Sequence, residues 1–403
     1  MGGAVIRRSA LVALVATALV ATPQAQAAEP SPGTWLVSQF SEGDRLLRFP
    51  ADPSSGDPGL TADGVYALAA AGVGRSTAVK ASAWLAEPAQ LQTFAGDGEA
   101  ESYVGGLTKL ALVAQALGQD PTAYGGADLL GRLVALQDDT GRYRDRTDPA
   151  YEQTNAFTQA LAIIVLHRAG KDVSAAVEFQ ASTACPDGGF PIAFGLPACK
   201  SDVDGTAMVL QALLAAGEKD KSAAAVEWLV KQQQADGGFQ AMEPPTNANT
   251  TGLAVGALLA GGRKAAADKA VAYLKTLQIG CTGPADQRGA IAFDSTGFDA
   301  GTVVRATTQG MLGLARVSLA EVSASSATPG VPPIDCTTTT TTPPPATTTP
   351  VAPAPGGPAE APADPPLAVT GPDQAVPLTL FGSFAVLAGA VLLLVSRRRK
   401  GGA

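Results

Sequence analysis

Two kinds of helix alternate between residues 33 and 321. Segments such as 206–217 and 251–262 are apolar at nearly every position, which is expected of a helix enclosed on all sides. In 222–234, by contrast, apolar residues lie toward one side and Glu227 and Lys231 toward the other, at the i,i+4 spacing of a water-facing helix. Enclosed segments begin near residues 61, 106, 156, 206, 251 and 303, and amphipathic ones near 35, 78, 128, 174, 222 and 265. The pattern predicts six inner and six outer helices.

The two helices form a repeating unit. VEWLVKQQQADGGF at 226–239 is echoed by VEFQASTACPDGGF at 177–190. One aromatic position of the unit, spaced by 45 to 49 residues between neighbouring copies, is filled by Trp35, Trp84, Phe179, Trp228 and Tyr273. The first outer helix has no inner helix before it, and the last inner helix, about 302–319, has no outer helix after it, so pairing these two would close a ring. We predict an all-α fold, an (α/α)6 toroid of six hairpins; an open solenoid of stacked hairpins also satisfies the pattern.

The start of the chain has the organisation of an export signal. Arg7 and Arg8 precede an apolar run from Ala10 to Val20, and Ala25 to Ala27 supplies the small residues that signal peptidase accepts. About a dozen apolar residues are too few for a bilayer, which needs roughly 20. We therefore predict a signal peptide over residues 1–27 and an exported protein.

The end of the chain carries three features in a fixed order. LAVTG at 367–371 is followed by an apolar stretch at 376–395 and by four basic residues at 397–400. A stretch of this length can cross a bilayer with the basic cluster on the cytoplasmic side. The arrangement resembles the cell-wall sorting signal of Gram-positive surface proteins, in the LAxTG form of actinobacteria, with Ala368 where LPxTG has proline. The resemblance implies that a sortase cleaves between Thr370 and Gly371 and joins Thr370 covalently to peptidoglycan; a plain single-span anchor is the alternative.

A stalk of Ser, Thr, Pro and Ala, residues 322–366, separates the repeats from this signal. Such a segment has almost nothing to bury, so we expect an extended, semi-stiff spacer across a cell wall. The whole chain has a net charge of −8, and removing the six basic residues and the single acidic residue that lie outside 28–370 leaves −13. Nucleic-acid binding driven by counterion release is therefore not expected.

The outer-helix motif WLVKQQQADGGF is similar to the repeat of the protein prenyltransferase β-subunit and terpene cyclase superfamily, and the repeats cover about 33–321. Prenyltransferases of this kind use zinc bound by Asp, Cys and His to activate a thiolate. The only histidine here is His167, in the last turn of an inner helix, where helix-end capping is its expected role. We therefore expect no zinc site and no other cofactor.

The four cysteines lie in loops or beyond the last helix. In an exported protein an even number suggests disulfides, and four cysteines allow three connectivities. We favour Cys185 with Cys199, which would clip one loop, and Cys281 with Cys336, which would fasten the end of the domain.

DVDGTA at 202–207 is the strongest candidate for chemistry. It resembles the DxDDTA motif of class II terpene cyclases, whose middle Asp protonates an alkene or epoxide, and Asp204 falls on that acid's position. Gly205 replaces the last Asp, however, and losing an adjacent carboxylate removes part of what holds a buried, neutral acid. Aligning the inner helices places Asn247 and Asn249 opposite Asp202 and Asp204, and Asn cannot donate a proton in this way but can cap a helix.

All inner helices follow outer ones, so they should run parallel and begin at one mouth of the ring. Its rim would carry Asp202, Asp204, Thr206, Asn247, Asn249 and Thr251. Clustered polar groups above an apolar lumen favour a small-molecule pocket, although side chains can also fill a lumen. The favoured function is a wall-tethered, non-catalytic toroid that binds a small hydrophobic or amphipathic ligand or a partner. An extracellular cyclase or transferase using Asp204 and a structural or adhesion protein remain as alternatives.

Overall fold

The computed structural model describes residues 30–242 and 244–336. The predicted signal peptide, the stalk beyond residue 336, the LAVTG motif and the apolar stretch at 376–395 lie outside these residues. Among the helices that are described, none has the length and apolar character needed to cross a membrane. The described chain is helical, with isolated β-bridges and no named strand, which agrees with the predicted all-α class.

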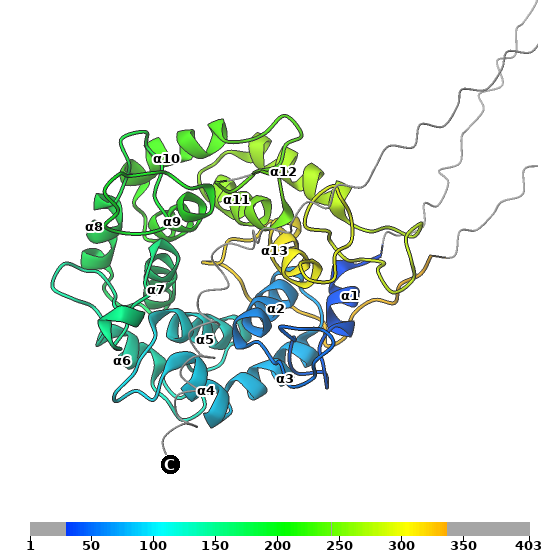
Figure 1. Cartoon of the computed structure of the whole chain (residues 1–403), viewed down its shortest axis with the longest axis horizontal. Helices are drawn as coiled ribbons and strands as arrows, with labels where there is room; N and C mark the ends of the chain where they lie inside the picture. Colours follow the sequence, from blue (N-terminus) through cyan, green and yellow to red (C-terminus); the bar gives the residue numbers. More distant parts are fainter. Residues whose placement is uncertain (1–29, 243, 337–403) are drawn as a thin grey trace, which may run out of the picture.

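Six apolar helices succeed one another around a centre (Figure 1). They are α2 (Pro58–Ala71), α5 (Val104–Leu117), α7 (Ala156–Arg168), α9 (Val203–Ala215), α11 (Ala248–Ala260) and α13 (Val303–Ala315). Each contacts the next in this order, and α13 contacts α2, so the succession has no free end. The approach of α11 to α13 requires glycine, because a Cβ on Gly252 would lie 2.1 Å from the carbonyl oxygen of Gln309.

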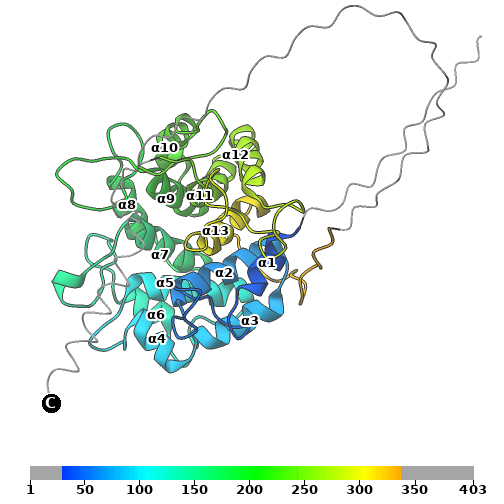
Figure 2. The same ribbon diagram turned by 45° about the vertical axis from the view of Figure 1, so that its right-hand side comes forward.

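The amphipathic helices lie outside these six (Figure 1). They are α1 (Pro32–Ser38), α3 (Arg75–Leu85), α4 (Pro88–Ala95), α6 (Leu129–Val134), α8 (Ser174–Ser182), α10 (Lys219–Lys231) and α12 (Lys264–Leu277). Each occurs where an outer helix is expected except α4, which the sequence pattern did not predict. Helix α4 starts with Pro88, which is favourable at a first helical position, and buries Leu91 and Ala95. The first helix, α1, contacts both α2 and α13, and Figure 2 shows the three side by side.

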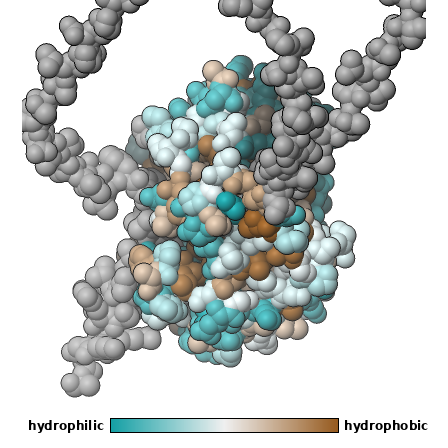
Figure 3. Space-filling view, turned by 90° about the vertical axis from the view of Figure 1, so that its right-hand side faces the viewer, coloured by the Kyte–Doolittle hydropathy of each residue, from teal (hydrophilic) through white to brown (hydrophobic). Residues whose placement is uncertain are grey.

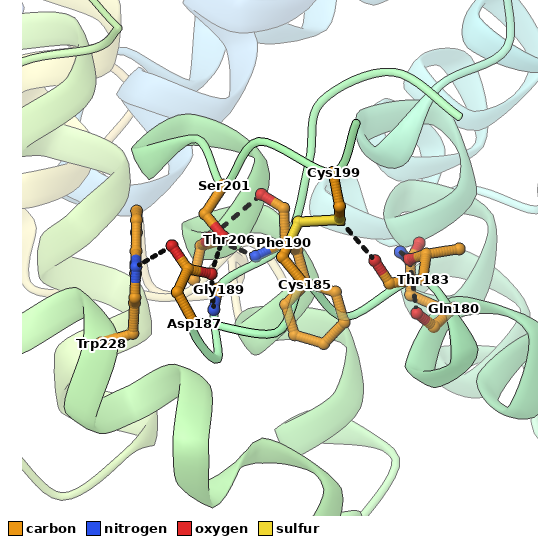
Figure 4. Close-up of a disulfide and its surroundings, with 10 residues drawn as sticks. All are labelled: Gln180, Thr183, Cys185, Asp187, Gly189, Phe190, Cys199, Ser201, Thr206 and Trp228. Carbon is orange, nitrogen blue, oxygen red and sulfur yellow. Dashed lines mark hydrogen bonds between the residues drawn. A yellow bond between two sulfur atoms is a disulfide. The ribbon is translucent and has the colours of Figure 1, made fainter. Parts of the chain in front are cut away.

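The recurring aromatic position ties outer helices to neighbouring loops. The indole nitrogen of Trp228 donates to Oδ2 of Asp187, the Asp of one DGGF segment, at 3.0 Å (Figure 4). Trp35 donates in the same way to the carbonyl of Asp286, and the Tyr273 hydroxyl donates to the carbonyl of Thr246. These aromatics therefore hold the loops that lead into the inner helices.

The junction between the first and last helices is closed by a small apolar cluster. Trp35, Ala290 and Val303 are buried together there, and the Trp35 ring meets Phe298 edge-on at a centroid distance of 6.4 Å. Figure 3 shows the molecule from the side on which α1 lies: its most hydrophobic residues gather near the middle of the face, among hydrophilic ones.

Packing continues beyond residue 321, where the stalk was expected to begin. We call residues 317–330 the strap. Leu319, Val322 and Ala324 are buried. Backbone N–H groups of the strap donate to the last turn of α5, at Ala116, and to Gly72 at the end of α2. Composition alone hides this segment, because its Ser, Thr, Pro and Ala residues resemble those of the stalk.

Two disulfides join the four cysteines in the pairs favoured from the sequence. Cys185–Cys199 clips the loop before α9, and its surroundings are drawn in Figure 4. Cys281–Cys336 closes a separation of 55 residues and attaches the chain beyond the strap to the loop that follows α12.

Candidate ligand site at the mouth of the ring

One hydrogen bond recurs at the start of five inner helices and fixes their common register. A side chain one turn into the helix accepts from a backbone N–H of the preceding loop. The acceptors and donors are Thr61 and Leu46, Gln159 and Tyr143, Thr206 and Phe190, Thr251 and Phe239, and Thr307 and Ile291. In α5 the register follows from a different bond. The backbone N–H of Tyr103 donates to the carbonyl of Ala95, just as the N–H of Asp202, the residue before α9, donates to the carbonyl of Phe190. Tyr103 is therefore equivalent to Asp202. These acceptors point outward, toward the loops.

The same loops bring the starts of neighbouring inner helices to one end of the ring. The carbonyl of Ile192 accepts from Ala156 at the start of α7, and that of Phe190 accepts from Asp202 at the start of α9. In the same way Asp145, in the loop before α7, accepts from Val104 at the start of α5. We call this end the mouth.

Residues two positions before or after the outward acceptor lie about 160° away from it, because a helix turns 100° per residue, so they face the inside of the ring. The first level, two positions before, consists of Gly59, Gly105, Phe157, Asp204, Asn249 and Arg305. The second level, two positions after, consists of Asp63, Lys109, Leu161, Met208, Leu253 and Gln309. All six first-level residues are partly exposed, although the helices that carry them are mostly buried.

Four of the six predicted rim residues have structural roles. Asp202 and Asn247 are the N-caps of α9 and α11, and each side chain accepts from a backbone N–H three residues on, at 2.8 and 2.9 Å. Thr206 and Thr251 are fully buried and point outward from the ring, where each hydroxyl accepts from the backbone of a DGGF loop. Their hydroxyls therefore do not line the inside of the ring.

Asp204 and Asn249 are the two rim residues that face inward. They occupy equivalent positions on neighbouring helices. The Oδ1 atom of each is closed to solvent and accepts no hydrogen bond from any described residue. A buried oxygen without a donor costs about 1–3 kcal/mol. Gln115 and Gln180 also bury such an oxygen, but Asp204 and Asn249 do so at equivalent positions of neighbouring inner helices.

Burial raises the pKa of Asp204 to about 7, and the charge of Asp202 acts in the same direction. A side-chain hydrogen bond from Thr250, at the start of α11, to the Asp204 carboxyl opposes this shift only in part. No cation is among the groups that act on Asp204. Its carboxyl group therefore changes protonation state near neutral pH, which an ordinary Asp with a pKa of 3.8 does not do.

The neighbouring Gly205 explains the departure from the DxDDTA pattern. A Cβ at this position would lie 3.1 Å from the carbonyl oxygen of Pro191 and 3.2 Å from the nitrogen of Ile192. Both are backbone atoms of the loop that joins α8 to α9, so this loop crowds the space that the family's last Asp would need. A side chain at position 205 would require this loop to shift by a few tenths of an ångström, which disfavours the second carboxylate of the motif.

Three charged residues on the other side of the mouth were missed in the sequence analysis. Asp63 of α2 lies between Lys109 of α5, at 2.6 Å, and Arg305 of α13, at 3.4 Å. Lys109 also donates to the carbonyl of Gly59. The available signal was a single charged residue in the first two turns of each of three helices that carry no other charge.

The opposite end of the ring is covered by the strap. Arg168, at the end of α7, donates to the carbonyls of Leu319, Ala320 and Val322. The side-chain oxygen of Gln211, near the end of α9, accepts from the Ser318 hydroxyl and the Leu319 N–H. A ligand at the first level would therefore approach from the mouth rather than from the strap side.

The remaining candidates for chemistry stand apart from the mouth. His167 is exposed in the last turn of α7. No group of three or more His, Cys, Asp and Glu residues suited to a metal ion occurs within the described ranges. A cavity of about 220 Å³ lies against the loop clipped by Cys185–Cys199 and is lined by residues such as Phe194 and Leu196.

Comparison with known proteins identifies the fold. No protein-family model and no curated protein sequence matches the chain. Among solved structures, an α-1,6-mannanase of Salegentibacter, as an inactive variant in complex with α-1,6-mannotriose, matches with a TM-score of 0.54 and 12% identity, over 72% of this chain and 98% of the mannanase. The type II terpene cyclase MstE from Scytonema matches with a TM-score of 0.51 and 16% identity, over 70% and 95%. The chain has an α/α toroid fold.

A protein from Actinoplanes is similar as well, with a TM-score of 0.50 and 16% identity, over 71% of this chain and 97% of that protein. The toroid predicted from the repeats is therefore supported by three structures that differ in sequence. At these identities the likeness shows the fold alone. Function has to be inferred from the residues at the mouth.

Proposed function

We propose that this chain is a wall-tethered, non-catalytic binding protein whose (α/α)6 double ring takes a small amphipathic ligand at its mouth. The observation that carries the proposal is the pair of inward-facing oxygens, Oδ1 of Asp204 and Oδ1 of Asn249, for which no described residue supplies a donor. Both oxygens are closed to solvent in the structure, so the two side chains would have to turn toward the mouth to meet a ligand. Hydroxyl groups of that ligand would then supply the missing donors and relieve the cost of burying both acceptors.

The apolar residues below these two acceptors suit the other part of such a ligand. Leu161, Met208 and Leu253 form half of the second level, and Phe157 lies at the first level beside α9. Hydrogen-bonding groups at the entrance and apolar side chains beneath are the usual combination in small-molecule sites. The proposed ligand is therefore hydroxylated on one side and apolar on another.

The proposed location follows from the ends of the chain. A signal peptide at 1–27 would export the protein, and sortase cleavage between Thr370 and Gly371 would attach Thr370 to peptidoglycan after the apolar stretch at 376–395 has held the precursor in the membrane. The Thr- and Pro-rich stalk would then present the toroid away from its attachment point. Western blotting of wall and membrane fractions from cells that express the wild type or Thr370→Ala tests the location separately. We expect the wild type in the wall fraction and the variant in the membrane fraction.

Native mass spectrometry of the chain secreted from an actinobacterial host tests the binding proposal. We expect a discrete added mass that is lost in the double variant Asp204→Ala, Asn249→Ala. Asp220→Ala is the matched control, because Asp220 also lies in the first turn of a helix, α10, but is exposed. A bare mass after exposure to lipid and metabolite extracts would refute ligand binding. That result would favour a packed ring acting through its outer surface, as in an adhesion protein.

One observation favours a second candidate, an enzyme with Asp204 as general acid. A carboxyl with a pKa of about 7 is suited to giving a proton to an oxygen leaving group near neutral pH. It is a poor donor to an alkene, which needs a much stronger acid, and the backbone around Gly205 crowds the position of the second carboxylate of the cyclase motif. Turnover of the captured ligand that disappears in Asp204→Asn would support this candidate. Turnover unaffected by the substitution would exclude it.

A further inference from the structure

The charged cluster at the mouth has one more positive than negative charge. Asp63 is only 8% exposed and is shared between two cations, whereas the side chains of Lys109 and Arg305 are 26% and 32% exposed. Arg305 uses one of its terminal nitrogens on Asp63, at 3.4 Å, and no other hydrogen bond of its side chain is recorded within the described residues. A planar guanidinium offers five donors, so most of the hydrogen-bonding capacity of Arg305 remains for a ligand.

Access to the cluster is built into the first level. On α5 the residue above Lys109 is Gly105, and a Cβ there would meet only a methyl group of Thr158, at 3.4 Å. A side chain at this position would cover the Lys109 ammonium group, whereas glycine leaves it open to the mouth. Arg305 stands at the first level itself, on α13, next to the helix that carries Asn249.

We propose that the ligand is a hydroxylated acid with an apolar face, such as an acidic sugar, whose single carboxylate binds Lys109 and Arg305 while its hydroxyl groups donate to Asp204 and Asn249. This inference rests on the proposed binding function and specifies its ligand. One end of the site is Asp204 and Asn249, and the other is Lys109 and Arg305. The helices that carry them follow one another around the ring in the order α9, α11, α13, α2 and α5.

Neutral donors suit the Asp204 end better than a second charge does. Asn249 carries no charge, and burial already shifts the carboxyl of Asp204 toward its neutral form, with a pKa of about 7. A hydroxyl group can donate to either form of this carboxyl and to the amide oxygen of Asn249. The positive cluster, by contrast, requires an anion to become neutral.

D-Glucuronate and D-glucose are the probes that test this inference, because they share ring hydroxyls and differ in the carboxylate. Binding of each to the purified chain would be measured by calorimetry at low and high salt. We expect glucuronate to bind about tenfold to a hundredfold more tightly than glucose, the range for a hydrogen bond to a charged group. We expect added salt to weaken glucuronate binding and to leave glucose binding unchanged.

Variants divide the two ends of the site. Arg305→Met should bring the affinity for glucuronate close to that for glucose, and Lys109→Met, which leaves Asp63 paired with Arg305, provides the same comparison if the first variant folds poorly. Asn249→Ala should weaken both sugars alike. Equal binding of the two sugars, or a preference for glucuronate that persists in Arg305→Met and Lys109→Met, would overturn the inference. Failure of both sugars to bind would also overturn the inference that the ligand is a hydroxylated acid. The proposed binding function would still be supported if native mass spectrometry showed an added mass.

Discussion

Replacing Asp204 with Asn should change how the stability of the fold depends on pH. The native carboxyl has a pKa of about 7, against an ordinary value of 3.8 in the unfolded chain. The native state therefore holds this proton more tightly than the unfolded state does. As the pH rises from about 4 to about 7, the wild-type chain should lose stability relative to Asp204→Asn, and above about pH 8 the difference should be constant.

The size of the effect follows from the two pKa values. Each pH unit between them is worth about 1.4 kcal/mol, so the free energy of unfolding of Asp204→Asn should gain up to about 4 kcal/mol on the wild type between pH 4 and pH 8. This is an upper value, because Asp204 is partly exposed and solvent screens its charge. Asn at this position keeps the shape of the side chain and removes only the ionisation.

Urea unfolding at several pH values, with the disulfides intact, measures the difference. Asp220→Asn is the control: an exposed Asp in the first turn of a helix is favoured by the helix dipole, so its replacement should lower stability slightly, by well under 1 kcal/mol. Parallel stability curves for wild type and Asp204→Asn would refute the reasoning, because they would show that the carboxyl titrates alike in both states.

Three further predictions concern the framework of the site. Arg168→Met removes three hydrogen bonds to strap carbonyls and should increase amide exchange in residues 318–330 by at least tenfold, without changing exchange in α11; unchanged exchange in the strap would contradict its attachment through Arg168. Gly205→Asp should destabilise the fold by about 1–3 kcal/mol through its contact with the Pro191 loop, seen as a lower urea midpoint; an unchanged midpoint would show that the loop yields easily. Replacing Cys281 and Cys336 with Ser opens a separation of 55 residues and should lower the free energy of unfolding by about 4 kcal/mol in the same assay. A loss below about 1 kcal/mol would show that this disulfide does not stabilise the domain.

The helical framework could be predicted because its signal is repeated along the chain. An enclosed helix is apolar all round and an outer helix on one side only, and six copies of this contrast place every inner helix where the structure has it. The preference for Cys185 with Cys199 needed only the loop between two such helices. Helix α4 was missed because its eight residues add a second helix to one outer layer, which no other repeat has.

The site was only partly predictable, because its residues come from different repeats. Asp202 and Asp204 are two positions apart in sequence, yet one caps a helix and the other faces the inside of the ring. Their positions within the first turn decide this, because a helix turns 100° per residue. The bond of Asp63 to Lys109 joins consecutive inner helices, but its bond to Arg305 spans 242 residues and exists only because the ring closes, so no local pattern pairs these three charges. The strap was missed because a segment without strong hydrophobic periodicity can still be held by backbone hydrogen bonds.

The attachment of Cys336 to Cys281 has a mechanical consequence. With the proposed tether, any pull on the stalk enters the domain at residue 336, and the disulfide transmits the tension directly to the loop between α12 and α13. The strap lies upstream of this point, so its hydrogen bonds to Gly72, Ala116 and Arg168 are shielded from the load. A cell surface under flow could then strain the stalk without peeling away the segment that covers one end of the ring.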